Sequence, residues 1–269
     1  VAKARAADGD EAGAMAADAG TLWADHGEDG QVRTADPDAK YIGVYDSAAL
    51  ADVVAEIREA GQCSMDVETT GLDPMQCHLC GVSIAVRPGQ AWYIPTRSPE
   101  PETHLDEHAV LDGLRPVLED ASIIKIAHNA KFDLNVLRSA GVHVRGQVCD
   151  TMIASYVADA TRSSHRMDAL ALGELGLHCI PISSLIGTGK QQRSFDTVAL
   201  EKAVPYAAED ADITLRLWDV LSSAVEAVGL SELLMNMELP LMGVLADMEF
   251  AGVAIDPDEL DHQRLVLSR

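Results

Sequence analysis

Hydrophobic and polar positions between residues 39 and 229 follow two kinds of pattern. Short apolar runs rich in β-branched residues predict strands at residues 41–45, 62–67, 81–86, 91–95 and 122–127. Apolar positions at helical spacing predict helices at residues 47–60, 109–118, 130–140, 150–159, 167–175, 197–203 and 206–227, the first of them with Ser47 as its N-cap. Since strands dominate the first half and helices the second, we expect an α/β or α+β domain around a mixed five-stranded sheet flanked by helices.

The pattern changes on both sides of this region. Residues 1–38 are rich in Ala, Gly and Asp without apolar periodicity, which predicts a flexible acidic linker. After residue 229, further helices are expected at residues 239–250 and from residue 257 to the last residue. The first residue is Val rather than Met, so we expect a piece of a longer protein. The interpretation is a linker at 1–38, a folded domain at 39–229 and the truncated start of another domain at 230–269.

Composition adds a strong acidic bias to an ordinary globular chain. The formal net charge is −23, and residues 1–38 hold nine acidic against three basic side chains, which leaves −17 for the remainder. Nucleic-acid-binding proteins usually carry a basic surface, so a bound polyanion would need bridging cations and a local groove. The basic residues close to the segments discussed below are Lys125, Lys131, Arg138, Lys190 and Arg193.

Two function classes are not supported by the sequence. No apolar run reaches the roughly 18 residues of a membrane span, and the N-terminus does not resemble a signal peptide, so we expect a cytoplasmic protein. The five cysteines have irregular spacing and do not predict a disulfide framework. Cys77 and Cys80 lack a second ligand pair for structural zinc.

The candidate chemistry starts with two acids on a predicted strand. Asp66 and Glu68 are two residues apart, so their side chains project from the same face while Val67 faces the core. Two carboxylates this close repel each other unless a cation bridges them. Asn129 and Asp133 stand four apart at the start of a helix that directly follows a predicted strand, which places both on one face.

A third pair lies on the long predicted helix. Tyr206 and Asp210 are four residues apart and therefore adjacent in space. At about 100° per residue, Asp210 lies about 40° from Tyr206 around the helix, whereas Asp212 lies about 240° away. Glu209, about 60° off on the other flank, is not excluded by this geometry.

Oxygen ligands without His or Cys suit Mg²⁺ or Mn²⁺. Two such ions about 4 Å apart activate a water and stabilise the departing oxygen in a displacement at phosphorus. A tyrosine hydroxyl with an ordinary pKa near 10 orients such a water rather than acting as a strong base. The three segments together therefore predict a carboxylate site for phosphodiester hydrolysis.

These segments resemble the three motifs of the DEDDy 3′–5′ exonuclease superfamily: Asp-x-Glu, Asn-x-x-x-Asp and Tyr-x-x-x-Asp. The flanking sequence is most similar to the proofreading domain of bacterial family A DNA polymerases, the DNA polymerase I type. The similarity spans roughly residues 40–269 and is carried by residues 66–74, 125–133, 149–152, 167–170 and 206–215. Residues 237–256 resemble the segment that opens the polymerase domain of that family.

The resemblance implies an RNase H-like (DnaQ-like) fold, two Mg²⁺ ions that Mn²⁺ can replace, and release of 5′-mononucleotides from a DNA 3′ end. It implies that Asp66, Glu68 and Asp210 hold the first ion and that Asp66 is shared with the second. Asp133 would act through metal-bound water, and Tyr206 with Glu68 would position the nucleophilic water. The implied contacts to terminal nucleotides are Thr69, Leu72 and Asn129, with Leu72 as an apolar wedge. His128 stands where some relatives carry Gln.

The implied partners are single-stranded or frayed DNA 3′ ends and a polymerase domain in the same chain. A monomer without membrane contact, associated with the nucleoid, is expected. Two alternatives remain: a stand-alone RNase D-like exoribonuclease, and a catalytically silent structural domain of a polymerase. For the loop around Lys190 and Arg193, phosphate contact and ordinary solvated charge are equally good interpretations.

Overall fold

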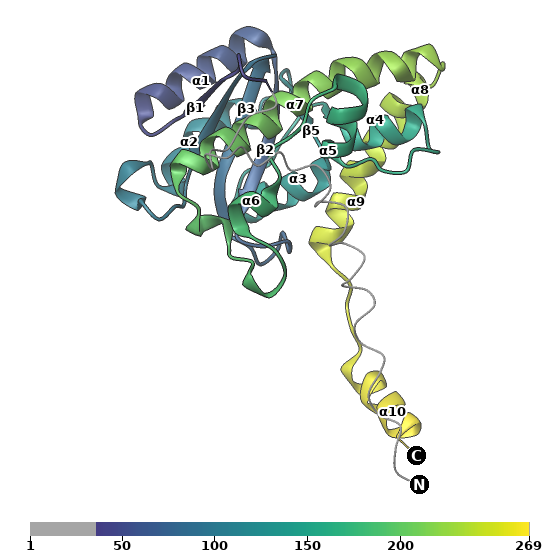
Figure 1. Ribbon diagram of the computed structural model, residues 1–269. Coiled ribbons are helices and arrows are strands. Elements are labelled where there is room, and N and C mark those ends of the chain that lie inside the picture. The colour runs from purple at the N-terminus through teal and green to yellow at the C-terminus, as the bar shows by residue number, and fades with distance from the viewer. Residues whose placement is uncertain (1–35, 269) are drawn as a thin grey trace.

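One mixed sheet forms the centre of the protein, whose computed structural model describes residues 36–268 (Figure 1). Its six strands lie in the order β1-β4-β3-β2-β5-β6. Their bounds are β1 Lys40–Gly43, β2 Gln62–Thr69, β3 Leu79–Arg87, β4 Gln90–Pro95, β5 Ile124–Ala127 and β6 Val148–Asp150. The central β2 pairs antiparallel with β3 and parallel with β5. Most of the predicted linker at 1–38 lies outside the described residues.

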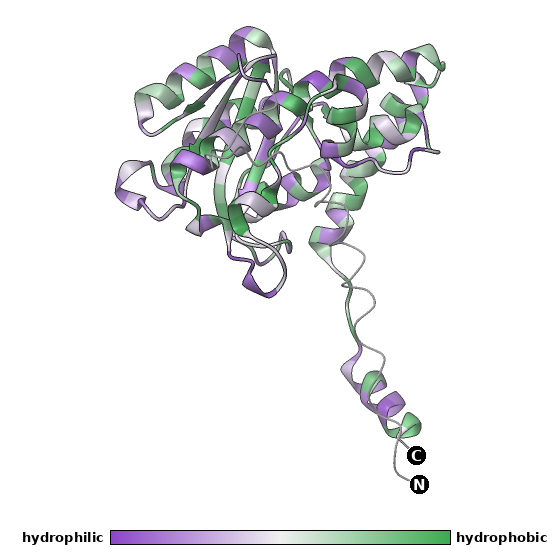
Figure 2. Ribbon diagram, viewed as in Figure 1, coloured by the Kyte–Doolittle hydropathy of each residue, from purple (hydrophilic) through white to green (hydrophobic). Residues whose placement is uncertain are grey.

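Helices cover both faces of this sheet and build a separate core on each. On one face, α1 (Ser47–Ala60) and α2 (Glu107–Leu118) pack their apolar sides against β2 and β3. On the other, the long helix α7 (Leu200–Ala227) crosses β1 to β5 and packs with α4 (Thr151–Ala158). In Figure 2 the hydrophobic positions gather on the sheet and on the helix sides turned toward it. The expected α/β architecture is confirmed.

The alternation along β2 decides which of its side chains meet α7. Met65 and Val67 belong to the core beneath α1 and α2. The side chains that alternate with them project toward α7. Among these, Ser64 Oγ donates a hydrogen bond of 2.6 Å to the carbonyl of Ala211. Asp66 and Glu68 therefore lie on the α7 side of the sheet, as the period of two predicts.

Three expectations about elements were wrong. The sheet has six strands rather than five, because the three residues of β6 pair with β5 in a run too short to show a pattern. The helices expected at 197–203 and 206–227 are one helix, since Pro205 is accommodated near the start of α7. Asp46, not Ser47, caps α1 by accepting hydrogen bonds from the amides of Ala48 and Ala49.

Shorter elements complete the domain. The helix α3 (Ala130–Ser139) follows β5 directly, and α5 (Met167–Leu170) continues into a π-helical turn at Ala171–Leu175. A loop then carries α6 (Ile182–Ile186) and leads to α7. Single 3₁₀ turns occur at Pro101–Thr103, Gly189–Gln191 and Phe195–Thr197.

The chain after α7 leaves the sheet. The elements are α8 (Ser231–Leu233), a π-helical turn (Leu234–Glu238), α9 (Leu239–Ala251) and α10 (Pro257–Leu267). The helix α9 packs against α3, while α10 projects away from the domain and is exposed throughout (Figure 1). Among the helices at 36–268, none has the length and apolar character needed to cross a membrane.

Candidate active site

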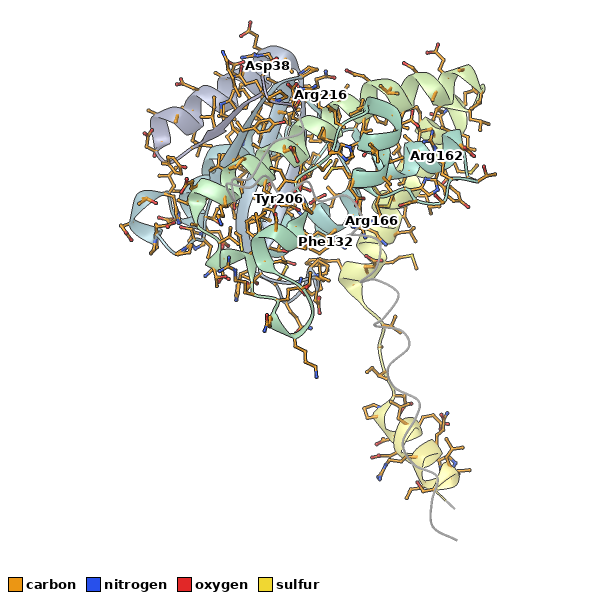
Figure 3. The ribbon with its side chains drawn as sticks, in the orientation of Figure 1. Asp38, Phe132, Arg162, Arg166, Tyr206 and Arg216 are labelled. Carbon is orange, nitrogen blue, oxygen red and sulfur yellow. The ribbon has the colours of Figure 1, made fainter. Side chains whose placement is uncertain are left out.

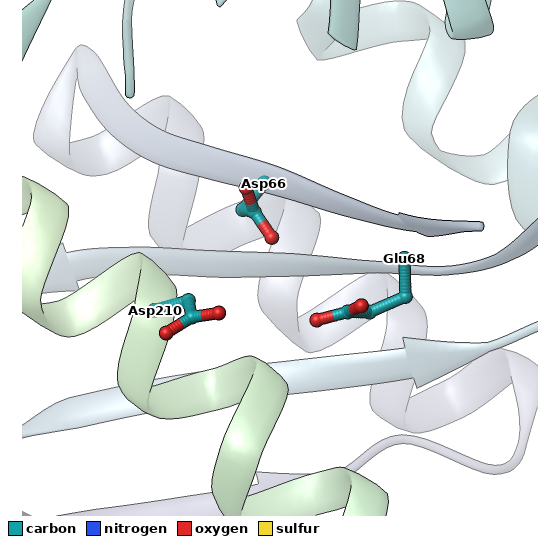
Figure 4. Close-up of side chains that lie close together, drawn as sticks. All are labelled: Asp66, Glu68 and Asp210. Atoms are coloured by element: carbon teal, nitrogen blue, oxygen red, sulfur yellow. The ribbon is translucent and has the colours of Figure 1, made fainter. Parts of the chain in front are cut away.

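Three carboxylates from two elements converge between the sheet and α7. Asp66 and Glu68 come from β2 and Asp210 from α7, and each offers an oxygen within 4.8 Å of the others. Figure 4 shows the three side chains pointing toward one another. We call these three residues the acidic nest. Strand alternation paired Asp66 with Glu68 and helix phase favoured Asp210 in the sequence prediction, and the motif resemblance joined the two elements.

The acidic nest has no basic partner within the described chain. Between residues 36 and 268, none of its three acids forms an ion pair, and the buried Oε1 of Glu68 has no hydrogen-bond partner. Burial raises the pKa of Asp66 to about 7. Burial and then the charge of Asp66 raise the pKa values of Glu68 and Asp210 well above the ordinary range. Such a group of oxygen donors fits a hard divalent cation, which would remove this mutual repulsion.

Asp133 lies beside the acidic nest on the first turns of α3. It is 2% exposed, and its Oδ2 has no partner within the described residues. Burial and then the charge of Asp66 raise the pKa of Asp133 well above its usual value. Asn129 occupies the N-cap position of α3 with φ of 64°, but its exposed side chain makes no capping hydrogen bond. The structure thus brings Asp133 close to Asp66 and leaves the side chain of Asn129 exposed.

The other acids of α7 face different partners. Asp212 is fully buried and accepts hydrogen bonds from Tyr41 Oη at 2.9 Å and from the amide of Gly89 at 2.8 Å. Glu209, which the helix phase left open, accepts a hydrogen bond of 2.6 Å from the amide of Ile180. Asp210 is therefore the acid of this segment that joins the acidic nest.

Tyr206 lies one turn before Asp210 and contacts it. Its hydroxyl forms a hydrogen bond with the Asp210 carboxylate, and burial raises the pKa of Tyr206 well above its ordinary value. The phenol therefore stays protonated and donates to Asp210. Its ring lies 5.9 Å from that of Phe195, and Figure 3 marks its place on α7.

The remaining predicted contact residues lie around the end of β2. Thr69 Oγ1 donates to the carbonyl of Gly71 at 2.7 Å, which shapes the turn after the strand. Leu72 follows in this turn and is 93% exposed, an unusual position for a large apolar side chain. His128 is held by Thr151, whose Oγ1 lies 2.8 Å from Nδ1, and burial lowers the pKa of His128 to about 4.

Most of the basic residues near these segments are already engaged. Lys125 is fully buried and donates to the carbonyls of Asp120 and Arg145, so it is a structural residue. Arg193 donates to the carbonyl of Leu185, whereas Lys190 is exposed. Ion pairs join two basic residues of α3 to α9: Lys131 with Glu249 at 2.5 Å, and Arg138 with Asp247 at 2.6 Å.

Sequence reasoning gave no role to Asp150, which is 2% exposed at the end of β6. Its carboxylate accepts hydrogen bonds from the starts of both α3 and α4. An Asp at the start of a predicted helix is the usual signal for an N-cap, and that signal could have identified the half of its partners that lie in α4.

Comparisons with known proteins identify the family of the chain. Residues 41–226 match the family described as 3′–5′ exonuclease. The chain is 41% identical over 244 residues to DNA polymerase I of Pseudomonas aeruginosa, covering 88% of this chain and 27% of that protein. It is 41% identical over 243 residues to DNA polymerase I of Chloroflexus aurantiacus, covering 89% and 25%. The chain therefore spans about a quarter of the length of these curated relatives.

Solved structures share the fold. The polymerase domain of Pol1 from M. smegmatis, in complex with a DNA primer-template and dNTP, superimposes with a TM-score of 0.64 at 24% identity, over 82% of this chain and 34% of that one. Brucella melitensis NrnC with bound Mg²⁺ gives 0.59 at 25% identity, over 81% and 98%. Escherichia coli RNase D gives 0.59 at 19% identity, over 78% and 51%. The RNase H-like exonuclease fold expected from the resemblance is confirmed.

Proposed function

Because the chain belongs to the 3′–5′ exonuclease family of the family A DNA polymerases, we propose that it removes nucleotides from DNA 3′ ends with two divalent cations. The products are 5′-mononucleotides, and the process served is proofreading during replication and repair. The observation that carries this proposal is the acidic nest, whose three carboxylates share a site without a basic partner among residues 36–268.

The side chains divide the work according to their positions. Asp66, Glu68 and Asp210 would hold the first cation, with Asp66 shared by the second, and Asp133 would act mainly through metal-bound water. The ions, Mg²⁺ or Mn²⁺, supply an activated water and a counter-charge for the departing oxygen. Removal of the repulsion among the acids makes binding of these ions favourable, which is supported by the raised pKa values of all four carboxyls.

Tyr206 and Glu68 orient the attacking water. The protonated phenol of Tyr206 is held by Asp210, so it offers its oxygen as an acceptor while its proton stays on the carboxylate side. Glu68 has a free oxygen, Oε1, that can accept from the same water. The role of Tyr206 is orientation rather than proton abstraction, since burial raises the pKa of its phenol and keeps it protonated.

Three side chains around the site contact the terminal nucleotides. Leu72 offers an exposed apolar surface against the last base, and Asn129 offers a side-chain amide that no capping bond occupies. Thr69 is the last residue of β2. Because the protein is strongly acidic, a DNA strand in this site would be held mainly through the bound cations.

We further propose that residues 39–229 form the nuclease and that residues 230–269 open a polymerase domain in the same chain. An exposed apolar side of α9 supports the second part, because Leu241, Val244, Leu245 and Met248 are each at least 40% exposed. A monomeric protein at the nucleoid is the corresponding expectation for the cell. An RNase D-like activity on RNA is the second candidate, since that enzyme has the same fold.

The decisive experiment incubates the chain with Mg²⁺ and an end-labelled single strand of DNA or RNA, beside an Asp66→Ala control. We expect mononucleotides from DNA with the parent protein and at least about 100-fold less with the variant. Equal rates in both proteins would contradict the proposed site. Faster release from RNA would favour the second candidate, and no product from either strand would favour a silent structural domain.

A further inference from the structure

Four backbone amides from two helix starts converge on the single carboxylate of Asp150. Within its own helix, Oδ1 accepts from the amides of Met152 at 2.8 Å and Ile153 at 3.2 Å. Across to α3, the same carboxylate accepts from the amides of Ala130 at 2.8 Å and Asn129 at 3.3 Å. An ordinary N-cap satisfies the first turn of one helix, whereas Asp150 satisfies two.

The second set of bonds replaces a cap that α3 lacks. Asn129 occupies the N-cap position, yet its side chain makes no capping bond and its backbone has φ of 64°, the left-handed region. A non-glycine residue in that region is costly and persists when surrounding contacts hold it. The bonds from Asp150 to the amides of Asn129 and Ala130 are such contacts, and they leave the Asn129 side chain free for other partners.

Neighbouring contacts fix the same junction. Thr151 Oγ1 donates to the carbonyl of Ala127 at 3.3 Å and lies 2.8 Å from Nδ1 of His128. The end of β6 is thus joined to the end of β5 by Asp150 and Thr151 together. The first turns of α3, which carry Asp133, therefore take their position from the residue pair that opens α4 (Figure 1).

From this geometry we propose that Asp150 is a positioning residue for the hydrolysis, acting through the orientation of Asp133 and Asn129. This inference rests on the proposed function. Asp150 touches neither substrate nor cation in this scheme. Its negative charge, spread over four amides and the partial positive ends of two helices, holds the Asp133 carboxylate beside the acidic nest.

The test compares Asp150→Asn with Asp46→Asn in the full chain. Asp46 is a matched control because it caps α1 through two amides, on the face of the sheet away from the acidic nest. The first measurement is amide hydrogen exchange without metal. We expect about tenfold faster exchange at Asn129 and Ala130 in Asp150→Asn, and unchanged exchange there in Asp46→Asn. Unchanged protection in Asp150→Asn would overturn the capping argument.

The second measurement is single-turnover cleavage of labelled single-stranded DNA in Mg²⁺, at a temperature where every variant is folded. Asp150→Asn should be about 10- to 100-fold slower, as for residues that orient a metal ligand, and Asp46→Asn should match the parent. In the double variant with Asp133→Ala, Asp150→Asn should add no further loss, because both changes act on the same carboxylate. Additive losses would overturn the route through Asp133.

The outcomes separate this inference from the function beneath it. A parent chain that releases no nucleotide contradicts the proposed function. The hydrogen-exchange measurement then still tests whether Asp150 caps α3. An active parent with an equally active Asp150→Asn contradicts the inference alone.

Discussion

Two buried acids on α7, only two residues apart, have opposite surroundings. Asp212 is surrounded by donors: Tyr41, the Gly89 amide and the guanidinium of Arg216, which bonds to both carboxylate oxygens. Asp210 faces Asp66 and Glu68 and has Tyr206 as its donor. Figure 3 marks the two ends of this stretch with Tyr206 and Arg216. The contrast teaches that burial alone does not mark an acid as a candidate metal ligand. The mark is the lack of a positively charged partner among residues 36–268, which distinguishes Asp210 from Asp212.

The same helix therefore carries a fully paired acid at Asp212 and, two residues earlier, an acid to which the proposed function gives a chemical role. Arg216 also pairs with Asp36 at 2.7 Å, so the Asp212 network ties the chain entering β1 to the turn between β3 and β4. Its charges are neutralised within the protein. Those of the acidic nest have no positively charged partner among residues 36–268, which is what a site for an added cation requires.

The largest expected effect is on the free energy of unfolding when Asp212 or Asp210 is replaced by Asn in the absence of metal ions. Asp212→Asn should lower the free energy of unfolding by about 3 kcal/mol, because it leaves the Arg216 charge poorly compensated. Asp210→Asn should raise it by about 1 kcal/mol, because it relieves repulsion from Asp66 and Glu68. Urea unfolding in chelator measures both. Changes of the same sign would break the contrast between the two positions.

Addition of a divalent cation should remove the repulsion within the acidic nest and raise the free energy of unfolding. At a Mn²⁺ concentration about 100 times the dissociation constant, the parent should gain about 2.7 kcal/mol over the chelated protein. Asp212→Asn should keep this increment, whereas Asp210→Asn should lose most of it. The measurement is urea unfolding with Mn²⁺ and with chelator. An increment that survives in Asp210→Asn would place the cation elsewhere.

A third prediction concerns pH in chelator. The folded-state pKa of Asp66 is about 7, against roughly 3.9 when unfolded, so the folded protein binds the extra proton between these values. The stability from this group is complete at low pH and is lost as pH rises through 7. Relative to the parent, Asp66→Asn should therefore gain about 2.6 kcal/mol between pH 5 and pH 8.

The difference between the two proteins reports Asp66 together with the acids whose pKa values its charge raises, and it removes the titration of His128. Burial lowers the pKa of His128 to about 4, so this histidine contributes the opposite slope up to its unfolded value near 6.5. Because His128 is present in both proteins, its contribution cancels. Parallel stability curves from pH 5 to pH 8 would show that Asp66 has an ordinary pKa.

Local periodicity was sufficient to predict which acids of the acidic nest share a face within each element. A period of two placed Asp66 and Glu68 together, and about 100° per residue separated Asp210 from Asp212. Both rules concern residues within one element, where the backbone fixes the directions of side chains. The assembly of the two elements came from the motif resemblance, since no local rule brings β2 beneath α7.

Contacts between distant segments account for what the sequence did not show. Asp150 bonds to amides 20 and 21 residues away, and Lys131 pairs with Glu249, 118 residues away. The short β6 exists because β5 lies beside it, and Pro205 remains helical because the rest of α7 is held by the core. Each depends on a partner chosen by the fold rather than by neighbouring residues.

The smallest expected effect sharpens the comparison further, because each acid has its own tyrosine. Tyr206→Phe should slow cleavage about tenfold, equivalent to about 1.4 kcal/mol of activation free energy, and should leave the Mn²⁺ stabilisation intact. Tyr41→Phe should lower the free energy of unfolding by about 1 kcal/mol and leave the rate per folded molecule unchanged. Single-turnover cleavage and urea unfolding of both variants measure these values. If Tyr206→Phe cleaves at the parent rate, the phenol only supports Asp210, and the two tyrosines perform the same structural task.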